Sequence, residues 1–436
     1  MSEPKVASAV QRFYVETLGC PKNQVDSDKI VGTLLADGMV ATDDPEAADL
    51  VVVNTCAFID DARRESIDTI LALDDRRHDG ARLVVTGCMA ERYGDELAEA
   101  LPEVDQVAGF GVPVTLGRKP IAVTAAAPES IPHLDLLNLP RPRSTSPWAY
   151  VKIAEGCDRS CGFCAIPSFR GPQRSRDIAS ILAEVDQLAA REIVLVAQDL
   201  ASYGKDRPDE LGAGSIVPLV RAVAERADRV RLLYLYPSDL SDDLIDAICD
   251  SGVPYFDLSL QHVSKPLLRR MRRWGDGERF LRRIHDIRAR EPHAAFRSNF
   301  IVGYPGETEA DHEQLMRFVE HAQLDWCGFF AYSAEDGTYA AALDGVVPAA
   351  LMGERLAELR ELQDEITAAR RDELIGTVQH VLVDEPGLAR SHREAPEIDG
   401  IVHVGQDLDV GTFVEVEIVD ALGPDLVAAG GRFGDD

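Results

Sequence analysis

The chain has 436 residues, enough for two or three domains that each bury a core of their own. Its 75 acidic side chains outnumber 45 Lys and Arg, and the net charge of −30 disfavours binding to nucleic acid through phosphate contacts. A basic partner fits this charge, although acidity also serves solubility alone. No apolar run reaches the ~18–20 residues that span a bilayer, and the first residues do not resemble a secretory signal. We therefore expect a cytoplasmic protein with eight reduced cysteines.

The first segment, residues 11–127, alternates short apolar runs with amphipathic stretches, which predicts a parallel α/β sheet covered by helices. In such sheets, ligands bind beyond the carboxyl ends of the strands. A functional site is therefore expected at that edge. We expect strands at residues 12–18, 49–53 and 82–86, and helices at residues 24–37, 59–74 and 90–100.

A cysteine follows each of these three strands: Cys20, Cys56 and Cys88. Because parallel neighbouring strands end at one edge of a sheet, the three thiols are expected to converge although the sequence separates them widely. A free cysteine is often only a small core residue, and one alone would be interpreted in that way. Three at equivalent positions favour a site that binds a metal or a cluster.

Residues 128–147 are rich in proline, which predicts a linker between domains. Residues 148–374 then alternate again through six βα units, which predicts an open (β/α)6 partial TIM barrel that ends in a charged exit helix from residue 348. Chemistry in such a barrel belongs at the carboxyl ends of its strands. The predicted strands are residues 149–154, 192–197, 230–235, 255–260, 297–302 and 327–332.

Residues 375–436 lack helical periodicity and instead alternate apolar and polar residues between glycine turns. This pattern predicts a small all-β module in the form of a barrel. The whole chain is therefore expected to be an α/β multidomain protein with a β barrel at its carboxyl end.

The stretch IAEGCDRSCGFCAIP places Cys157, Cys161 and Cys164 in a loop directly after the first barrel strand, with the spacing C-x3-C-x2-C. Structural zinc usually takes four ligands in paired arms, and no fourth Cys or His lies nearby. Three cysteines on a 4Fe–4S cluster leave one iron open to a substrate. The motif therefore favours a cluster over structural zinc.

This spacing after the first barrel strand resembles the signature of the radical S-adenosylmethionine (SAM) enzymes. The resemblance implies that Cys157, Cys161 and Cys164 hold the cluster that binds and cleaves SAM, and thereby have the catalytic role. It also implies that a 5′-deoxyadenosyl radical removes hydrogen from the substrate, which needs a low-potential electron and a closed site.

The whole chain resembles the methylthiotransferases within that superfamily. The resemblance implies a second, auxiliary 4Fe–4S cluster on Cys20, Cys56 and Cys88, and a carboxy-terminal TRAM domain, which is an OB-like β barrel. It also implies two roles for SAM, one as methyl donor and one as radical source. The matching stretches are TLGCPKNQVDSD, NTCAFIDDARRESI, VTGCMAERY, KIAEGCDRSCGFCAIPSFRGPQRSR, VAQDLASYG, LSLQHVSKPLLRRMRR, FIVGYPGETEADH and FAYSAEDGTYAA.

The family has one branch that acts on adenosine of transfer RNA and another that modifies the β-carbon of an aspartate in the twelfth protein of the ribosomal small subunit. The stretches LGCPKN, KIAEGCD and HREAPEIDG resemble the protein-directed branch. Residues 371–436 contain four arginines, no lysine and fifteen acidic residues, which gives 4 − 15 = −11. A module that grips RNA should be basic, whereas an acidic one suits a basic ribosomal protein. The alternative is that this charge only continues the acidity of the chain.

Four further residues are candidates for contact with SAM: Phe163, Gln198, Asp199 and Gly303. Gln198 and Asp199 end the second barrel strand, where a polar pair could equally cap the next helix. Gly303 suits close approach of a cofactor or a plain turn. His262, which follows the fourth strand, is expected to make a structural hydrogen bond because radical hydrogen transfer needs no base.

The resemblance also implies a low-potential electron donor, a sulfur donor and a ribosomal protein substrate, free or on the assembled subunit. We expect no membrane partner and no stable RNA binding by the free protein. Two other hypotheses stay open: a zinc- or cluster-bearing scaffold without enzyme activity, and a radical SAM enzyme with one cluster whose early cysteines are core residues.

Overall fold

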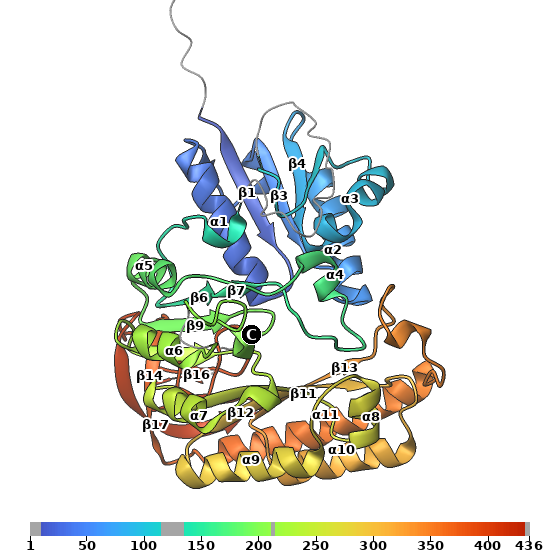
Figure 1. The fold of residues 1–436 in the computed structure, drawn as a ribbon. Coiled ribbons are helices and arrows are strands. Elements are labelled where there is room, and N and C mark those ends of the chain that lie inside the picture. Colours follow the sequence, from blue (N-terminus) through green and yellow to red (C-terminus); the bar gives the residue numbers. More distant parts are fainter. Residues whose placement is uncertain (1–9, 115–134, 211–213, 432–436) are drawn as a thin grey trace, which may run out of the picture. The chain divides into compact units, whose positions relative to one another are not determined.

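The computed structural model describes residues 10–114, 135–210 and 214–431. The chain divides into two compact units, of which the first comprises residues 1–142 together with residues 165–172. The second comprises residues 143–164 and 173–436. This division differs from the expected boundaries because residues 165–172 pack with the first unit although they follow the first strand of the barrel (Figure 1).

The first unit contains a five-stranded parallel sheet in the order β2-β1-β3-β4-β5. Its three principal strands agree with the prediction, and helices cover the sheet (Figure 1). Every residue of the central strand is buried, as expected for a parallel strand with both faces covered. The elements are β1 (Arg12–Thr17), α1 (Pro21–Ala36), β2 (Val40–Ala41), β3 (Leu50–Thr55), α2 (Asp60–Arg76), β4 (Arg82–Gly87), α3 (Cys88–Ala100) and β5 (Gln106–Ala108).

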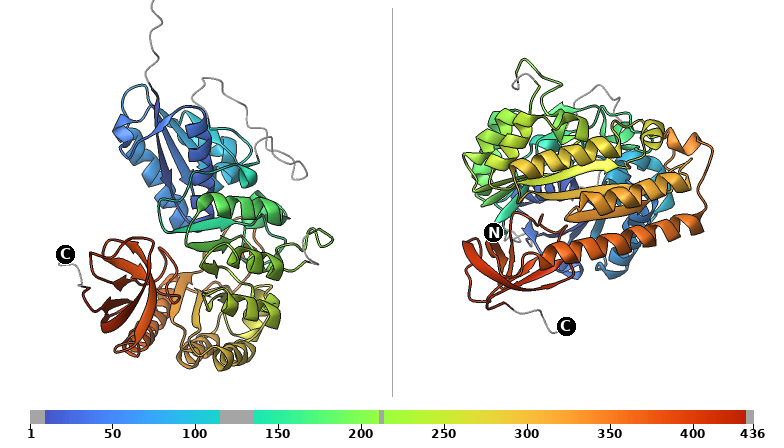
Figure 2. Two further views of the ribbon diagram at one scale, coloured as in Figure 1. Left: turned by 90° about the vertical axis from the view of Figure 1, so that its left-hand side faces the viewer. Right: turned by 90° about the horizontal axis from the view of Figure 1, so that it is seen from below.

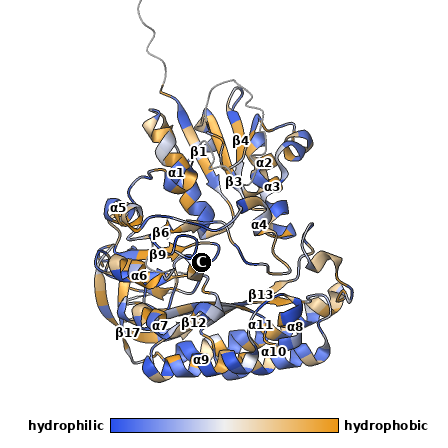
Figure 3. Ribbon diagram, viewed as in Figure 1, coloured by the Kyte–Doolittle hydropathy of each residue, from blue (hydrophilic) through white to orange (hydrophobic). Residues whose placement is uncertain are grey.

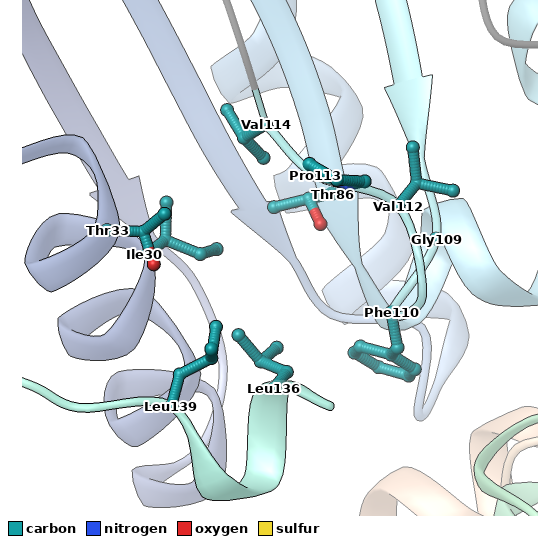
Figure 4. Close-up of a pocket in the computed structure, with 10 residues that line it drawn as sticks. All are labelled: Ile30, Thr33, Thr86, Gly109, Phe110, Val112, Pro113, Val114, Leu136 and Leu139. Carbon is teal, nitrogen blue, oxygen red and sulfur yellow. The ribbon is translucent and has the colours of Figure 1, made fainter. Parts of the chain in front are cut away.

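The end of the predicted linker is part of this unit. Residues 128–134 lie outside the described residues, but Leu136 and Leu137 of a short 3-10 helix are buried. Leu136 and Leu139 approach Ile30 of α1 and the loop after β5 around a small apolar pocket (Figure 4). The pocket is lined mainly by apolar side chains, and residues 135–139 therefore pack onto the first unit.

The second unit contains the six predicted barrel strands as two parallel three-stranded sheets, β6-β9-β10 and β11-β12-β13. An isolated bridge between Leu235 and Leu258 joins the two sheets on one side. The described strands do not close into a ring, so the barrel is open as predicted. The strands are β6 (Trp148–Lys152), β9 (Glu192–Val196), β10 (Arg229–Leu232), β11 (Tyr255–Gln261), β12 (Ala295–Val302) and β13 (Trp326–Ala331).

Helices cover the outer face of this barrel (Figure 2). Their apolar positions recur at helical spacing, and the buried residues of each helix join the core of the strands. The polar faces of α9, α10 and α11 are visible as blue ribbon in Figure 3. The helices are α5 (Ile178–Leu188), α6 (Val217–Ala224), α7 (Asp242–Asp250), α8 (Lys265–Arg270), α9 (Gly277–Arg290), α10 (Glu309–Ala322) and α11 (Ala349–Asp372).

The chain after α11 forms a closed barrel in the order β14-β15-β16-β18-β17, which confirms the predicted β module. Its interior is apolar and includes Val381, Val402 and Ile418. The strands are β14 (Val378–Glu385), β15 (Leu388–Arg390), β16 (Val402–His403), β17 (Phe413–Leu422) and β18 (Asp425–Ala428). Within the described part of the chain, no helix is both long and apolar enough to cross a membrane.

Candidate active site

Three cysteines of the first unit follow three neighbouring strands of its sheet. Cys20 caps the start of α1 after β1, Cys56 directly follows β3, and Cys88 is the first residue of α3 after β4. The pairs β1–β3 and β3–β4 are parallel, so these strand ends share one edge, as the sequence predicts.

Two glycines allow the three cysteine loops to pack closely. Gly19 has φ +96°, and a Cβ added there would lie 3.0 Å from Sγ of Cys56. Gly87 has φ +89°, and a Cβ there would lie 2.6 Å from the backbone oxygen of Thr55. Both positions combine a left-handed backbone with lack of space, which only glycine tolerates.

The side chain of Asn23 connects all three loops, and it was not singled out from the sequence. Its Nδ2 donates to the backbone oxygens of Leu18, at 2.9 Å, and Thr55, at 3.0 Å. Its Oδ1 lies 3.6 Å from Sγ of Cys88. Asn23 is fully buried, so these bonds are shielded from water and fix the relative positions of the loops.

Arg170 is a second residue that the sequence did not reveal. It ends α4 (Ile166–Arg170), the short helix that packs with the first unit. Its Nη2 lies 3.0 Å from Sγ of Cys88 and 2.9 Å from Oδ1 of Asn23. Its Nη1 lies 3.3 Å from the buried carboxylate of Asp26. The signal that could have found it is a basic residue shortly after a cysteine motif, but sequence alone does not show where it packs.

The three thiols have different electrostatic surroundings. Burial alone would raise the pKa of Cys20, but the charges of Lys22 and Arg170 and backbone hydrogen bonds hold it below its usual value. Burial raises the pKa of Cys56 to about 12. Burial also raises the pKa of Cys88, against the opposing charge of Arg170. A bound metal cluster would favour the thiolate form of all three.

The second cysteine group lies in the second unit, at the carboxyl end of its first barrel strand. A short antiparallel pair, β7 (Ala154–Glu155) with β8 (Arg174–Ser175), closes the base of the segment that contains Cys157, Cys161 and Cys164. The backbone NH of Cys164 donates to the oxygen of Cys161 at 3.2 Å. This tight loop has the compact form that the spacing predicts.

Gly162 fastens this loop to the barrel. Its NH donates to the oxygen of Met271 at 2.8 Å, and its oxygen accepts from the NH of Ala340 at 2.7 Å. A Cβ at this position would lie 2.8 Å from the hydroxyl of Tyr304. Gly162 is therefore required for close packing, while the adjacent Phe163 packs partly against the barrel core.

Donors also surround the sulfurs of this second group. The backbone nitrogen of Arg159 lies 3.4 Å from Sγ of Cys157. Nη1 of Arg273 lies 3.4 Å from Sγ of Cys161. Burial raises the pKa of Cys157 to about 11, although the hydrogen bond from Arg159 lowers it. Such hydrogen bonds to sulfur influence the reduction potential of iron–sulfur clusters.

Gln198 and Asp199 lie at the end of β9 and are tied to the cysteine loop. Nε2 of Gln198 donates to Glu155 at 2.8 Å, and the carboxylate of Asp199 accepts from Arg159 and Ser202. One oxygen of each side chain, Oε1 of Gln198 and Oδ1 of Asp199, is buried without a hydrogen-bond partner among the described residues. Buried polar atoms without partners are uncommon, and these two could accept hydrogen bonds from a bound molecule.

Gly303 has a structural reason for being glycine. It has φ +82°, and a Cβ there would lie 2.4 Å from Sδ of Met352 on α11. Its NH donates to the carboxylate of Glu307 at 2.6 Å. Its predicted contact with SAM stays a prediction. His262 is fully buried and its Nδ1 accepts from the NH of Ser264 at 3.1 Å, which confirms the expected structural hydrogen bond.

The chemistry of each donor set suits an iron–sulfur cluster. Each set offers three cysteines from tight glycine-bearing loops, which would leave one iron of a 4Fe–4S cluster without a protein ligand. Over the described ranges, no three His, Cys, Asp or Glu side chains are placed to hold a single metal ion. Cysteines around a cluster bind separate irons and need not meet at one point.

Family models match the chain in three consecutive parts. Residues 12–109 match a family described as uncharacterized protein family UPF0004, residues 151–319 match the radical SAM superfamily, and residues 375–429 match the TRAM domain. A structure of TsrM from Kitasatospora setae, a radical SAM methyltransferase with cobalamin and a [4Fe-4S] cluster bound, has a TM-score of 0.51. It covers 87% of this chain and 76% of that one at 14% identity, so it shows the fold alone.

The open barrel with its three-cysteine loop, preceded by the α/β domain and followed by the TRAM barrel, defines a radical SAM transferase. Relatives named ribosomal protein uS12 methylthiotransferase RimO share 40% identity in Kineococcus radiotolerans, over 98% of both chains. The relative of the same name in Saccharopolyspora erythraea is 42% identical over 96% of this chain and 94% of its own. The one in Anaeromyxobacter is also 42% identical, over 95% of this chain and 92% of its own. The chain belongs to this RimO methylthiotransferase family, whose cofactors are 4Fe–4S clusters and SAM.

Proposed function

We propose that Cys20, Cys56 and Cys88 hold an auxiliary 4Fe–4S cluster and that the loop of the second unit holds the cluster that binds SAM. When bound, the clusters and SAM would supply the electron, the 5′-deoxyadenosyl radical, and the sulfur and methyl group that methylthiolation adds. The donor sets support this proposal because each offers three thiols and leaves one iron open. The ligands of the SAM-binding cluster are Cys157, Cys161 and Cys164.

The residues around the second loop would orient SAM. Gln198 and Asp199 are fixed by Glu155, Arg159 and Ser202, and each retains one buried oxygen for a donor on the ligand. The amino group of SAM is such a donor. Rigid attachment of both side chains to the cysteine loop would reduce the entropy lost when the ligand is bound.

The substrate that we propose is ribosomal protein uS12, at the β-carbon of an aspartate. The observation that carries this choice is the location of the arginines at the end of α11 and in the TRAM domain. Arg371, Arg390 and Arg393 are buried and paired with acidic groups, so within residues 371–431 no arginine is available for an RNA phosphate. The acidic surface that remains fits a basic protein.

An activity assay tests this choice directly. The reconstituted enzyme is incubated without oxygen with SAM, reductant, sulfide and either uS12 or transfer RNA that contains isopentenyladenosine. We expect a mass increase of a methylthio group on the aspartate-bearing peptide and no modified nucleoside. Modification of the RNA with no change in uS12 would favour the other branch of the family.

Iron analysis tests the two ligand sets before any activity is measured. We expect about eight irons per chain, and about four after Cys20, Cys56 and Cys88 are replaced together by alanine. Replacement of Cys157, Cys161 and Cys164 should leave the other four. A chain that binds about four irons in all would support the one-cluster hypothesis, and zinc without iron or sulfide would support a scaffold.

A further inference from the structure

The chain departs from the barrel to bring one side chain to the first unit. The segment 165–172 begins immediately after Cys164, packs with the first unit, and is followed by Gln173, which belongs again to the second. It contains α4, which ends at Arg170, and Gly171 with φ +72° terminates the helix. Arg170 therefore lies six positions after Cys164, a candidate ligand of one cluster. It contacts Cys88, a candidate ligand of the other cluster.

The guanidinium of Arg170 is held on several sides. Its side chain is 3% exposed, and its Nη2 lies 3.0 Å from Sγ of Cys88 and 2.9 Å from Asn23. Nη1 faces Asp26 at 3.3 Å, and the ring of Phe110 lies 4.3 Å from the guanidinium carbon. The planar fork of Arg allows these simultaneous contacts, which the single ammonium group of Lys does not reproduce.

A buried cation at this place has a definite electrostatic effect. Three thiolates outweigh the positive charge of an oxidised cubane core, and reduction adds one more negative charge. In a medium of low dielectric constant, a nearby guanidinium stabilises the reduced form more than the oxidised form. The carboxylate of Asp26 has the opposite effect on the potential. Because Asp26 pairs with Arg170, the two charges partly cancel each other.

We infer that Arg170 is a positioning residue for the auxiliary cluster, which fixes Cys88 through a hydrogen bond to its sulfur and raises the reduction potential of the cluster. This inference rests on the proposed ligand set. Residues 165–172, which follow the radical SAM motif, would thus serve the auxiliary cluster. A purely structural role would only attach α4 to the first unit and would leave the potential unchanged.

The test uses the full chain in which Cys157, Cys161 and Cys164 are alanine, so that only the auxiliary cluster contributes a signal. The midpoint potential is measured by redox titration followed by electron paramagnetic resonance. Arg170→Met should lower the potential, and Arg170→Lys should lower it less because the charge remains. Asp26→Asn should raise it, since a negative charge is removed while Arg170 stays.

A matched control is Arg141→Met in the same unit. Arg141 is also buried, at 6% exposure, and pairs with Asp28, which lies eight residues beyond Cys20 along α1. Its replacement should leave the potential unchanged. If Arg170→Met does not retain iron, the Lys and Asp26→Asn variants still give opposite shifts.

Two results are distinguishable. An unchanged potential in Arg170→Lys and Asp26→Asn, with the cluster signal present, would overturn the inference but keep the ligand set. Absence of the signal in the parent protein, before Arg170 is changed, would instead contradict the proposed function.

Discussion

The guanidinium of Arg390, on β15 of the TRAM barrel, lies 3.3 Å from the carboxylate of Glu192, on β9 of the radical SAM barrel, and both side chains are buried. Arg231 approaches the same carboxylate, with 2.7 Å between its Nε and Oε1 of Glu192. A charged group therefore links the two barrels where a hydrophobic contact would be usual.

Arg390→Met should destabilise the second unit by about 3–5 kcal/mol, because it leaves a buried carboxylate with less compensation. The measurement is the free energy of unfolding in a denaturant titration monitored by circular dichroism. Arg226→Met is the control, since the pair between Arg226 and Asp186 is exposed and should contribute less than about 1 kcal/mol. Equal effects of the two changes would contradict the importance of the buried group.

Stability should fall between pH 6.5 and about 4 because two histidines have lowered pKa values in the folded chain. Burial lowers the pKa of His262 and of His392 from 6.5 to about 4. In this window the unfolded chain binds protons that the folded chain does not, so the free energy of unfolding decreases as pH decreases. The double replacement by Gln should flatten this dependence in the same titration performed at several pH values. A slope equal to that of the parent protein would show that other groups are responsible.

Gly87→Ala should disrupt the first unit far more than Gly80→Ala. Both glycines have positive φ, near +90°, at +89° and +93°. At Gly80 nothing lies within 4 Å of an added Cβ, so only backbone strain of about 1–2 kcal/mol arises. At Gly87 the Cβ would also lie 2.2 Å from Oδ1 of Asn54, which adds about 1–3 kcal/mol for overpacking. Iron content and thermal melting of both variants provide the comparison, and equal losses would contradict it.

Asn23→Ala should lower the iron content from about eight toward about four, because the bonds between the cysteine loops are lost. The cluster of the second unit should remain, as shown by SAM cleavage in the presence of reductant. Asn138→Ala, an exposed position in the same unit, is the control. Full iron content in Asn23→Ala would show that the cluster itself is sufficient to arrange the loops.

Charge reversal on the TRAM barrel should weaken the use of a basic substrate. Glu415 and Glu417 are exposed on β17, and their joint replacement by Lys should raise KM for uS12 several-fold with little change in kcat. The effect should diminish at high salt because exposed charges are screened. Glu320→Lys on α10 is the control for charge alone. An unchanged KM would exclude this face from substrate binding.

Much of the architecture followed from local patterns. The strand-to-cysteine order at Cys20, Cys56 and Cys88 predicted one shared sheet edge, because parallel strands end on the same side. The six barrel strands and the terminal β module also followed from periodicity. The limits of the linker did not follow from periodicity. Leu136 and Leu137 are buried, and the surface that buries them is formed by residues far away in the sequence.

The sequence by itself determined the two cysteine sets, their positions after strands and the acidity of residues 371–436. Only the tertiary structure decided that Arg170 contacts Cys88, which lies 82 positions earlier, and that Arg371, Arg390 and Arg393 are buried in ion pairs. The physical reason is that hydrophobic periodicity is a local property. The partner of a buried charge is chosen by packing between segments that are remote in the chain.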